Sequence, residues 1–115
     1  MIYVFIEQAA PERVSTSPLA LPASSYRYRD PLGAVLIIAP WNYPVQLLLN
    51  PLVAAIAAGN TAFLKPSELA PATSAVLTKM IPKYMDARCI KILEGDATLS
   101  QVCVTGMPNW SFVLG

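Results

Sequence analysis

The chain has 115 residues, enough for one domain with a single core, and 55% of them are apolar while only 13% are charged. Its net charge of +1 comes from scattered Lys and Arg residues, which argues against a nucleic-acid-binding surface. Without a histidine, Cys89 and Cys103 cannot build a zinc site or a Cys-His nucleophile pair, so we expect no metal and two free thiols in a reducing, cytoplasmic compartment.

The first 30 residues are weakly patterned. Several prolines and serines predict an irregular lead-in, and the alternation over residues 26–29 predicts a short, half-exposed strand. The N-terminus has only a six-residue apolar start before Glu7 and no basic region, which argues against a secretory signal.

A continuous aliphatic run over residues 33–39 predicts a strand covered on both faces, as in parallel sheets. Pro40 ends the run, and Pro44 suits the first position of a helix whose apolar residues recur at helical spacing. Pro51 falls inside this helix, so we expect a kink or a break there. Gly59 is the expected stop at its C-terminus.

A second strand is predicted over residues 61–64 and a third over residues 89–93. Pro71 can open a second helix between them. The apolar stripe expected on this helix consists of Val76, Leu77, Met80, Ile81 and Tyr84.

Asp96 is expected to cap a short helical turn, and residues 102–104 predict a fourth strand that ends at Thr105-Gly106. The order of strands and helices predicts an α/β fold with right-handed crossovers and a partial, doubly wound parallel sheet.

The long uncharged stretch between Pro31 and Leu64 raises the alternative of a membrane-associated hairpin over residues 33–58. A span needs roughly 20 continuous apolar residues. Three prolines and interspersed amide side chains interrupt this stretch and would leave backbone groups unsatisfied in a bilayer. We therefore expect no transmembrane span.

Chemistry in an open parallel sheet is expected at the carboxyl ends of the strands. The loop after the first strand has no glycine, which excludes a G-x-G-x-x-G cradle there. Asn42 stands in this proline-stiffened loop as either a helix cap or a fixed amide donor to an oxyanion. Lys65 and Glu68 follow the second strand, either as a surface ion pair or as a grip on a ribose diol.

Three linked segments carry a family resemblance. Residues 36–44 (LIIAPWNYP), 51–60 (PLVAAIAAGN) and 64–68 (LKPSE) resemble the aldehyde dehydrogenase superfamily. Tyr43 in the Trp-Asn-Tyr-Pro motif and the segment 81–84 (IPKY) are similar to the class 3 branch. The resemblance implies a Rossmann-like, truncated cofactor-binding domain.

The resemblance also implies roles for single residues. Asn42 matches the catalytic asparagine that stabilises the oxyanion, and Tyr43 matches a residue near the aldehyde pocket. Lys65 and Glu68 match the pair that holds the adenosine ribose, and a carboxylate at Glu68 implies NAD rather than NADP. The further cofactor-binding positions implied are Ile38, Pro40, Trp41 and Gly106.

In this family an aldehyde is oxidised to a carboxylic acid by a cysteine and a glutamate that lie downstream of these motifs. Neither Cys89 nor Cys103 stands in the nucleophile motif. We therefore expect a fragment with no dehydrogenase turnover by itself. The alternative is a non-catalytic partner or regulator that forms homo- or hetero-oligomers with full-length subunits.

The expected division of the chain follows from the same motifs. Residues 1–30 form the lead-in, residues 31–106 the partial cofactor-binding domain, and residues 107–115 a divergent tail. In the tail, Met107 and Ser111 stand where the family has serine and glycine after its Thr-Gly pair.

Overall fold

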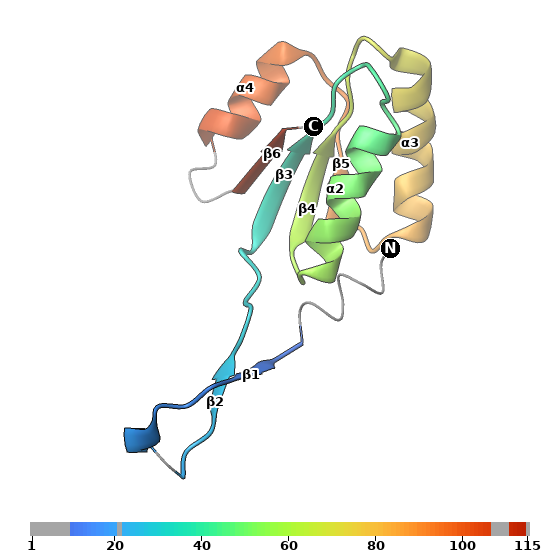
Figure 1. Ribbon diagram of the computed structural model, residues 1–115. Helices are drawn as coiled ribbons and strands as arrows, with labels where there is room; N and C mark the ends of the chain where they lie inside the picture. Colours follow the sequence, from blue (N-terminus) through green and yellow to red (C-terminus); the bar gives the residue numbers. More distant parts are fainter. Residues whose placement is uncertain (1–9, 21, 107–110, 115) are drawn as a thin grey trace.

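The structure is a computed structural model and describes residues 10–20, 22–106 and 111–114, the last four by their backbone alone (Figure 1). Strands β1 (Glu12–Val14) and β2 (Ser25–Arg27) form an antiparallel pair, with the short 3-10 helix η1 (Pro18–Ala20) between them. This pair projects away from the main sheet in Figure 1. The strand expected over residues 26–29 is thus found two residues shorter at its end, and it has a partner that the sequence did not predict.

The main sheet has four parallel strands in the order β5-β4-β3-β6. Their bounds are Ala34–Ile38 for β3, Thr61–Lys65 for β4, Ile90–Ile92 for β5 and Ser111–Leu114 for β6. The predicted α/β fold with a parallel sheet is confirmed. Continuous aliphatic residues form the central strands because both faces of a parallel sheet are covered.

Helix α2 (Gln46–Ala57) connects β3 to β4 and runs through Pro51 without a break. The break expected at Pro51 is therefore wrong, and a kink there stays a prediction. Pro44 lies in the turn before the helix rather than at its first position. The backbone N–H of Leu47 already donates to the carbonyl of Tyr43 at 3.0 Å, so the turn leads directly into the helix.

Gly59 ends α2 as predicted. Its φ of +81° lies in the left-handed region that favours glycine. The N–H of Gly59 donates to the Ile56 carbonyl and that of Asn60 to the Ala55 carbonyl, both at 2.9 Å, which is the Schellman arrangement. The side chain of Asn60 then accepts from the N–H of Gly33 at 2.9 Å and so fastens the end of the helix to the start of β3.

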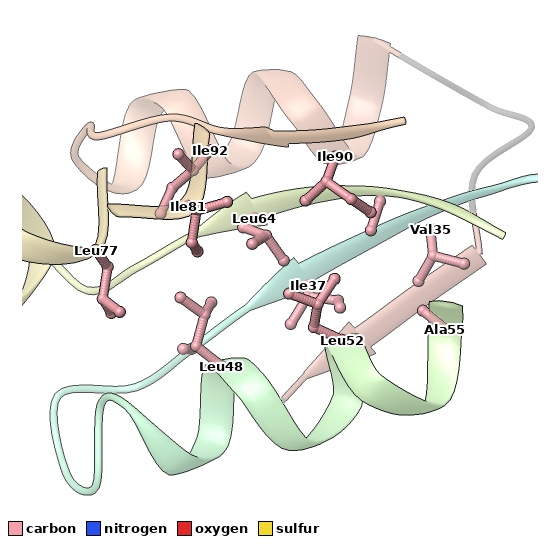
Figure 2. Packing of buried hydrophobic residues seen from close by; sticks show 12 residues of the cluster. Val35, Ile37, Leu48, Leu52, Ala55, Leu64, Leu77, Ile81, Ile90 and Ile92 are labelled. Atoms are coloured by element: carbon pink, nitrogen blue, oxygen red, sulfur yellow. The ribbon is translucent and has the colours of Figure 1, made fainter. Parts of the chain in front are cut away.

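Helix α3 (Pro71–Tyr84) begins at Pro71 as predicted. The core lies between the sheet and helices α2 and α3, as Figure 2 shows. Of the predicted stripe on α3, Leu77 and Ile81 are buried in this core, while Val76, Met80 and Tyr84 are exposed in this chain. The apolar stripe of α3 therefore includes residues that the sheet does not cover.

Helix α4 (Ala97–Gly106) contains residues 102–104, so the fourth strand predicted there is wrong. A three-residue apolar run fits a strand or a helix equally well by periodicity. Asp96 decides the outcome, because its carboxylate accepts from the N–H of Leu99 at 3.1 Å and caps a helix of ten residues. In Figure 2 this helix lies across the sheet from α2, which completes the double winding.

The fourth strand is β6, which pairs with β3 from Val35↔Ser111 to Ile38↔Leu114. It falls in the segment expected to be a divergent tail, so the sheet extends beyond the predicted boundary at Gly106. The division of the chain into three parts stays a prediction. Over the described ranges, no helix is both long and apolar enough to cross a membrane.

Candidate functional site

The carboxyl ends of β3 and β4 lie side by side. Ile38 is the register partner of Lys65, and the N–H of Ala39 donates to the Lys65 carbonyl at 3.0 Å. The two loops that the sequence singled out therefore leave the sheet at the same edge. One carries Asn42 and the other carries Glu68.

Lys65 is a buried cation with two partners. Its side chain is 4% exposed, and Nζ lies 2.7 Å from Oε2 of Glu68 and 3.2 Å from the carbonyl oxygen of Pro66. The Glu68 side chain is 42% exposed and remains open to solvent. The Lys65 hydrogen bond, together with a backbone N–H, lowers the pKa of Glu68, and desolvation and the charge of Asp96 oppose this shift. Glu68 is thus held as a carboxylate beside an ammonium.

The turn that carries this pair is fixed by its own residues. Pro66 is fully buried, and the hydroxyl of buried Ser67 accepts from the N–H of Leu69 at 3.2 Å. The N–H of Ala70 donates to the Ser67 carbonyl at 3.2 Å, and α3 starts at Pro71. These contacts place Glu68 one turn ahead of the helix, at the sheet edge.

An open pocket of about 210 Å³ lies next to Glu68. It is lined by Glu68, Pro71, Ser74, Glu94 and Gly95. Oε1 of Glu94 accepts hydrogen bonds from the hydroxyls of Ser74 and Thr78, each at 3.1 Å. The pocket therefore has a carboxylate on both the β4 side and the β5 side.

Of the five residues that line this pocket, only Glu68 is among the site residues predicted from the sequence; the other four are Pro71, Ser74, Glu94 and Gly95. Glu94-Gly95 could have been found, because it follows β5 as Lys65 to Glu68 follows β4, and ligands bind at such strand ends. Ser74 could not be predicted as a site residue, because nothing in the sequence indicates that its hydroxyl bonds to Glu94, 20 residues away.

The loop after β3 presents exposed side chains at Trp41, Asn42 and Tyr43. Helix α2 has no side-chain cap, so Asn42 does not cap it and the capping alternative is wrong. Within the described residues, the Asn42 side chain makes no hydrogen bond. Tyr43 has a φ of +49°, a left-handed backbone conformation that is uncommon outside glycine.

The other predicted cofactor positions are dispersed. Ile38 and Pro40 are half-buried at the end of β3, next to Lys65. Gly106 is the last residue of α4 rather than the end of a strand. The strand expected to end at Gly106 is therefore absent, while the cofactor contact that the resemblance implies for Gly106 stays a prediction.

The two cysteines, Cys89 and Cys103, are free thiols. Cys89 is exposed and comes just before β5, hence at the amino end of a strand parallel to β3. Cys103 is half-buried on α4. Over the described part of the chain, no group of His, Cys, Asp or Glu side chains is arranged to hold a metal ion.

Comparison with known proteins gives a consistent result. The model of the aldehyde dehydrogenase family matches residues 2–113. Aldehyde dehydrogenase family 3 member H1 of Arabidopsis thaliana is 49% identical over 89 residues, covering 77% of this chain and 18% of the relative. Aldehyde dehydrogenase family 3 member B2 of Mus musculus is 50% identical over 84 residues, covering 73% and 18%.

A solved structure is also similar. The substrate-bound state of Staphylococcus aureus AldH superposes with a TM-score of 0.82 at 42% identity, covering 88% of this chain and 22% of that protein. This chain thus spans about a fifth of the length of the relatives it matches.

Proposed function

Because the chain belongs to the aldehyde dehydrogenase family and is similar to its class 3 members, we propose that it forms the ribose-binding part of a nicotinamide cofactor site. The enzyme concerned would oxidise an aldehyde to a carboxylic acid. The observation that carries this proposal is the Lys65–Glu68 pair, held at the sheet edge beside an open pocket.

The pair fits a ribose diol chemically. An ammonium has three N–H donors, and Lys65 uses two of them on Pro66 and Glu68, so one is left for a hydroxyl oxygen. The exposed Glu68 carboxylate has further lone pairs that can accept from a hydroxyl. A carboxylate disfavours a 2′-phosphate, so we propose NAD as the cofactor. When bound, NAD would supply the hydride acceptor of the oxidation.

The loop after β3 would serve the aldehyde. Its side-chain amide, at Asn42, is exposed and unused, so it can donate to an oxyanion that develops at the same edge of the sheet. Removing such a donor typically costs about 100- to 1000-fold in rate. Tyr43 would stand beside the aldehyde. The remaining proposed cofactor contacts are Ile38, Pro40, Trp41 and Gly106.

Neither thiol of this chain is proposed as the nucleophile. Cys89 lies at the wrong end of the parallel sheet for attack on an aldehyde held near Asn42. We therefore expect no NADH formation when the chain is mixed with an aldehyde and NAD. Two free thiols are consistent with the reducing environment of the cytoplasm, which we propose as its compartment.

A second candidate role is association with further subunits of the same family. Three large apolar side chains on α3, those of Val76, Met80 and Tyr84, are exposed. Exposed apolar residues of this kind are typical of surfaces that other protein covers. Co-purification of the chain with a full-length relative would support a non-catalytic partner, and elution of the two as separate species would contradict it.

The proposed cofactor role is tested by isothermal titration of the purified chain with NAD. Lys65→Ala removes the charged donor, and loss of one charge-assisted hydrogen bond should weaken binding by about 10- to 100-fold. Asn42→Ala should leave the affinity within about threefold, because this amide is proposed to contact the aldehyde side. Lys83→Ala is the matched control, since Lys83 is an exposed lysine in the last turn of α3. Absence of saturable NAD binding, or equal losses in the two lysine variants, would contradict the proposal.

A further inference from the structure

We propose that Glu94 is a specificity-determining residue of this site, a second carboxylate that selects NAD against NADP. The inference deepens the proposed function and rests on it, because the pocket beside Glu68 is taken as the place of the adenosine ribose. It assigns to Glu94 a charge that rejects a 2′-phosphate in addition to that of Glu68.

Glu94 belongs to the pocket itself. It lines the same open cavity of about 210 Å³ as Glu68, and it reaches the cavity from the end of β5. Its carboxylate is anchored from α3 by the hydroxyls of Ser74 and Thr78. Ser74 is only 5% exposed, so one of the two anchors is a buried, built part of the site.

These two hydrogen bonds leave the second carboxylate oxygen of Glu94 free to bind a ligand. Both hydroxyls donate to Oε1. Within the described residues, Oε2 accepts no hydrogen bond, and a carboxylate oxygen has lone pairs for a ligand donor. A ribose hydroxyl can donate to it, whereas an ionised phosphate has only acceptors to offer.

The balance of charge distinguishes Glu94 from Glu68. The negative charge of Glu68 faces the ammonium of Lys65 at 2.7 Å. Among the described residues, no cation forms an ion pair with Glu94. Asp96 adds negative charge nearby, but it caps α4 and does not line the pocket. The uncompensated charge on the pocket wall is therefore that of Glu94.

A 2′-phosphate would bring further negative charge into this pocket. Repulsion between like charges falls with distance and with screening by solvent, so an open pocket gives a moderate effect. Neutralising Glu94 should therefore raise the affinity for NADP relative to NAD by roughly tenfold. Neutralising Glu68 would instead leave a buried ammonium that attracts a phosphate, which is a separate effect.

The test is isothermal titration of the wild-type chain and of Glu94→Gln with NAD and with NADP. Glu94→Gln keeps the side-chain length and an oxygen for Ser74 and Thr78, and it should shift the ratio of the two affinities toward NADP by roughly tenfold. Glu94→Asp keeps the charge and should retain the wild-type preference. Glu12→Gln removes one negative charge from β1, away from the main sheet, and should leave the ratio unchanged.

The outcomes separate the inference from the function on which it rests. Wild-type binding of NAD with an unchanged ratio in Glu94→Gln would overturn the inference and leave the proposed function standing. An equal shift in Glu12→Gln would also overturn it, because net charge rather than position would then be responsible. Loss of both dinucleotides in Glu94→Gln, with an unchanged circular dichroism spectrum, would mean that Glu94 holds the cofactor rather than selects it. Failure of the wild-type chain to bind NAD would overturn both proposals.

Discussion

Replacing Gly59 with alanine should lower the free energy of unfolding by about 1–2 kcal/mol. Gly59 follows α2 with a φ of +81°, a conformation in which a Cβ approaches the neighbouring carbonyl oxygen. The backbone hydrogen bonds that Gly59 and Asn60 donate to the last turn of α2 require this conformation. An alanine must therefore either accept the strain or give up the end of the helix.

The size of the effect follows from what a Cβ at this position would meet. The nearest atoms are Cβ and Cγ of Pro31, at 3.7 and 3.8 Å, which is ordinary van der Waals contact. The cost is thus conformational and not steric, and it should stay near the value for a single left-handed residue. Gly59→Asn should cost less, because asparagine tolerates this region better than alanine.

The assay is urea-induced unfolding followed by far-ultraviolet circular dichroism. Gly106→Ala is the matched control, because Gly106 lies in α4, its φ is not positive, and its Cβ would meet open space. That variant should be unchanged or more stable by up to about 1 kcal/mol, since alanine favours a helix over glycine. An unchanged midpoint in Gly59→Ala, or an equal loss in Gly106→Ala, would refute the reasoning.

Three further predictions follow from the core, from α4 and from the Lys65–Glu68 pair. Leu48→Ala should cost about 2–5 kcal/mol in urea unfolding because this side chain is fully buried, whereas Met80→Ala, half-exposed on α3, should cost about 1 kcal/mol or less. Asp96→Ala should cost about 1 kcal/mol by removing the cap of α4, and Asp96→Asn should recover most of it; equal losses would rule out a capping role. The lowered pKa of Glu68 means that its contact with Lys65 stabilises the chain above the carboxyl's unfolded pKa and is lost as the pH falls through the lower folded-state pKa. Unfolding midpoints measured from neutral to acid pH should therefore fall less steeply in Glu68→Gln than in the wild type.

Much of the fold could be predicted because local signals agree with the tertiary arrangement. Three local features each favour one structure. The aliphatic run of β3 favours a buried parallel strand, the glycine after α2 favours a helix end, and the proline before α3 favours a helix start. Lys65 and Glu68 could be placed at one sheet edge from the same pattern, because parallel strands bring their carboxyl ends together.

Two predictions failed, one because the local signal was ambiguous and one because packing outweighed it. Residues 102–104 form part of α4 because Asp96 caps a helix that continues through them, whereas their composition fits a strand equally well. Of the kink or break that Pro51 predicts in α2, the break is not found. The helix nevertheless continues, and its buried residues Leu48 and Leu52 on either side pack into the core.

The sequence by itself determined the family, the alternation of strands and helices, and the two loops that follow β3 and β4, because each depends on residue order and on spacing along the chain. Only the tertiary structure decided that Glu94, 26 residues after Glu68 in the sequence, lines the same pocket. It also decided that Lys65 is buried against Glu68 and that the Asn42 side chain caps no helix. Pocket walls and charge balance depend on side chains brought together from separate strands, and no local pattern in the sequence records which of them meet.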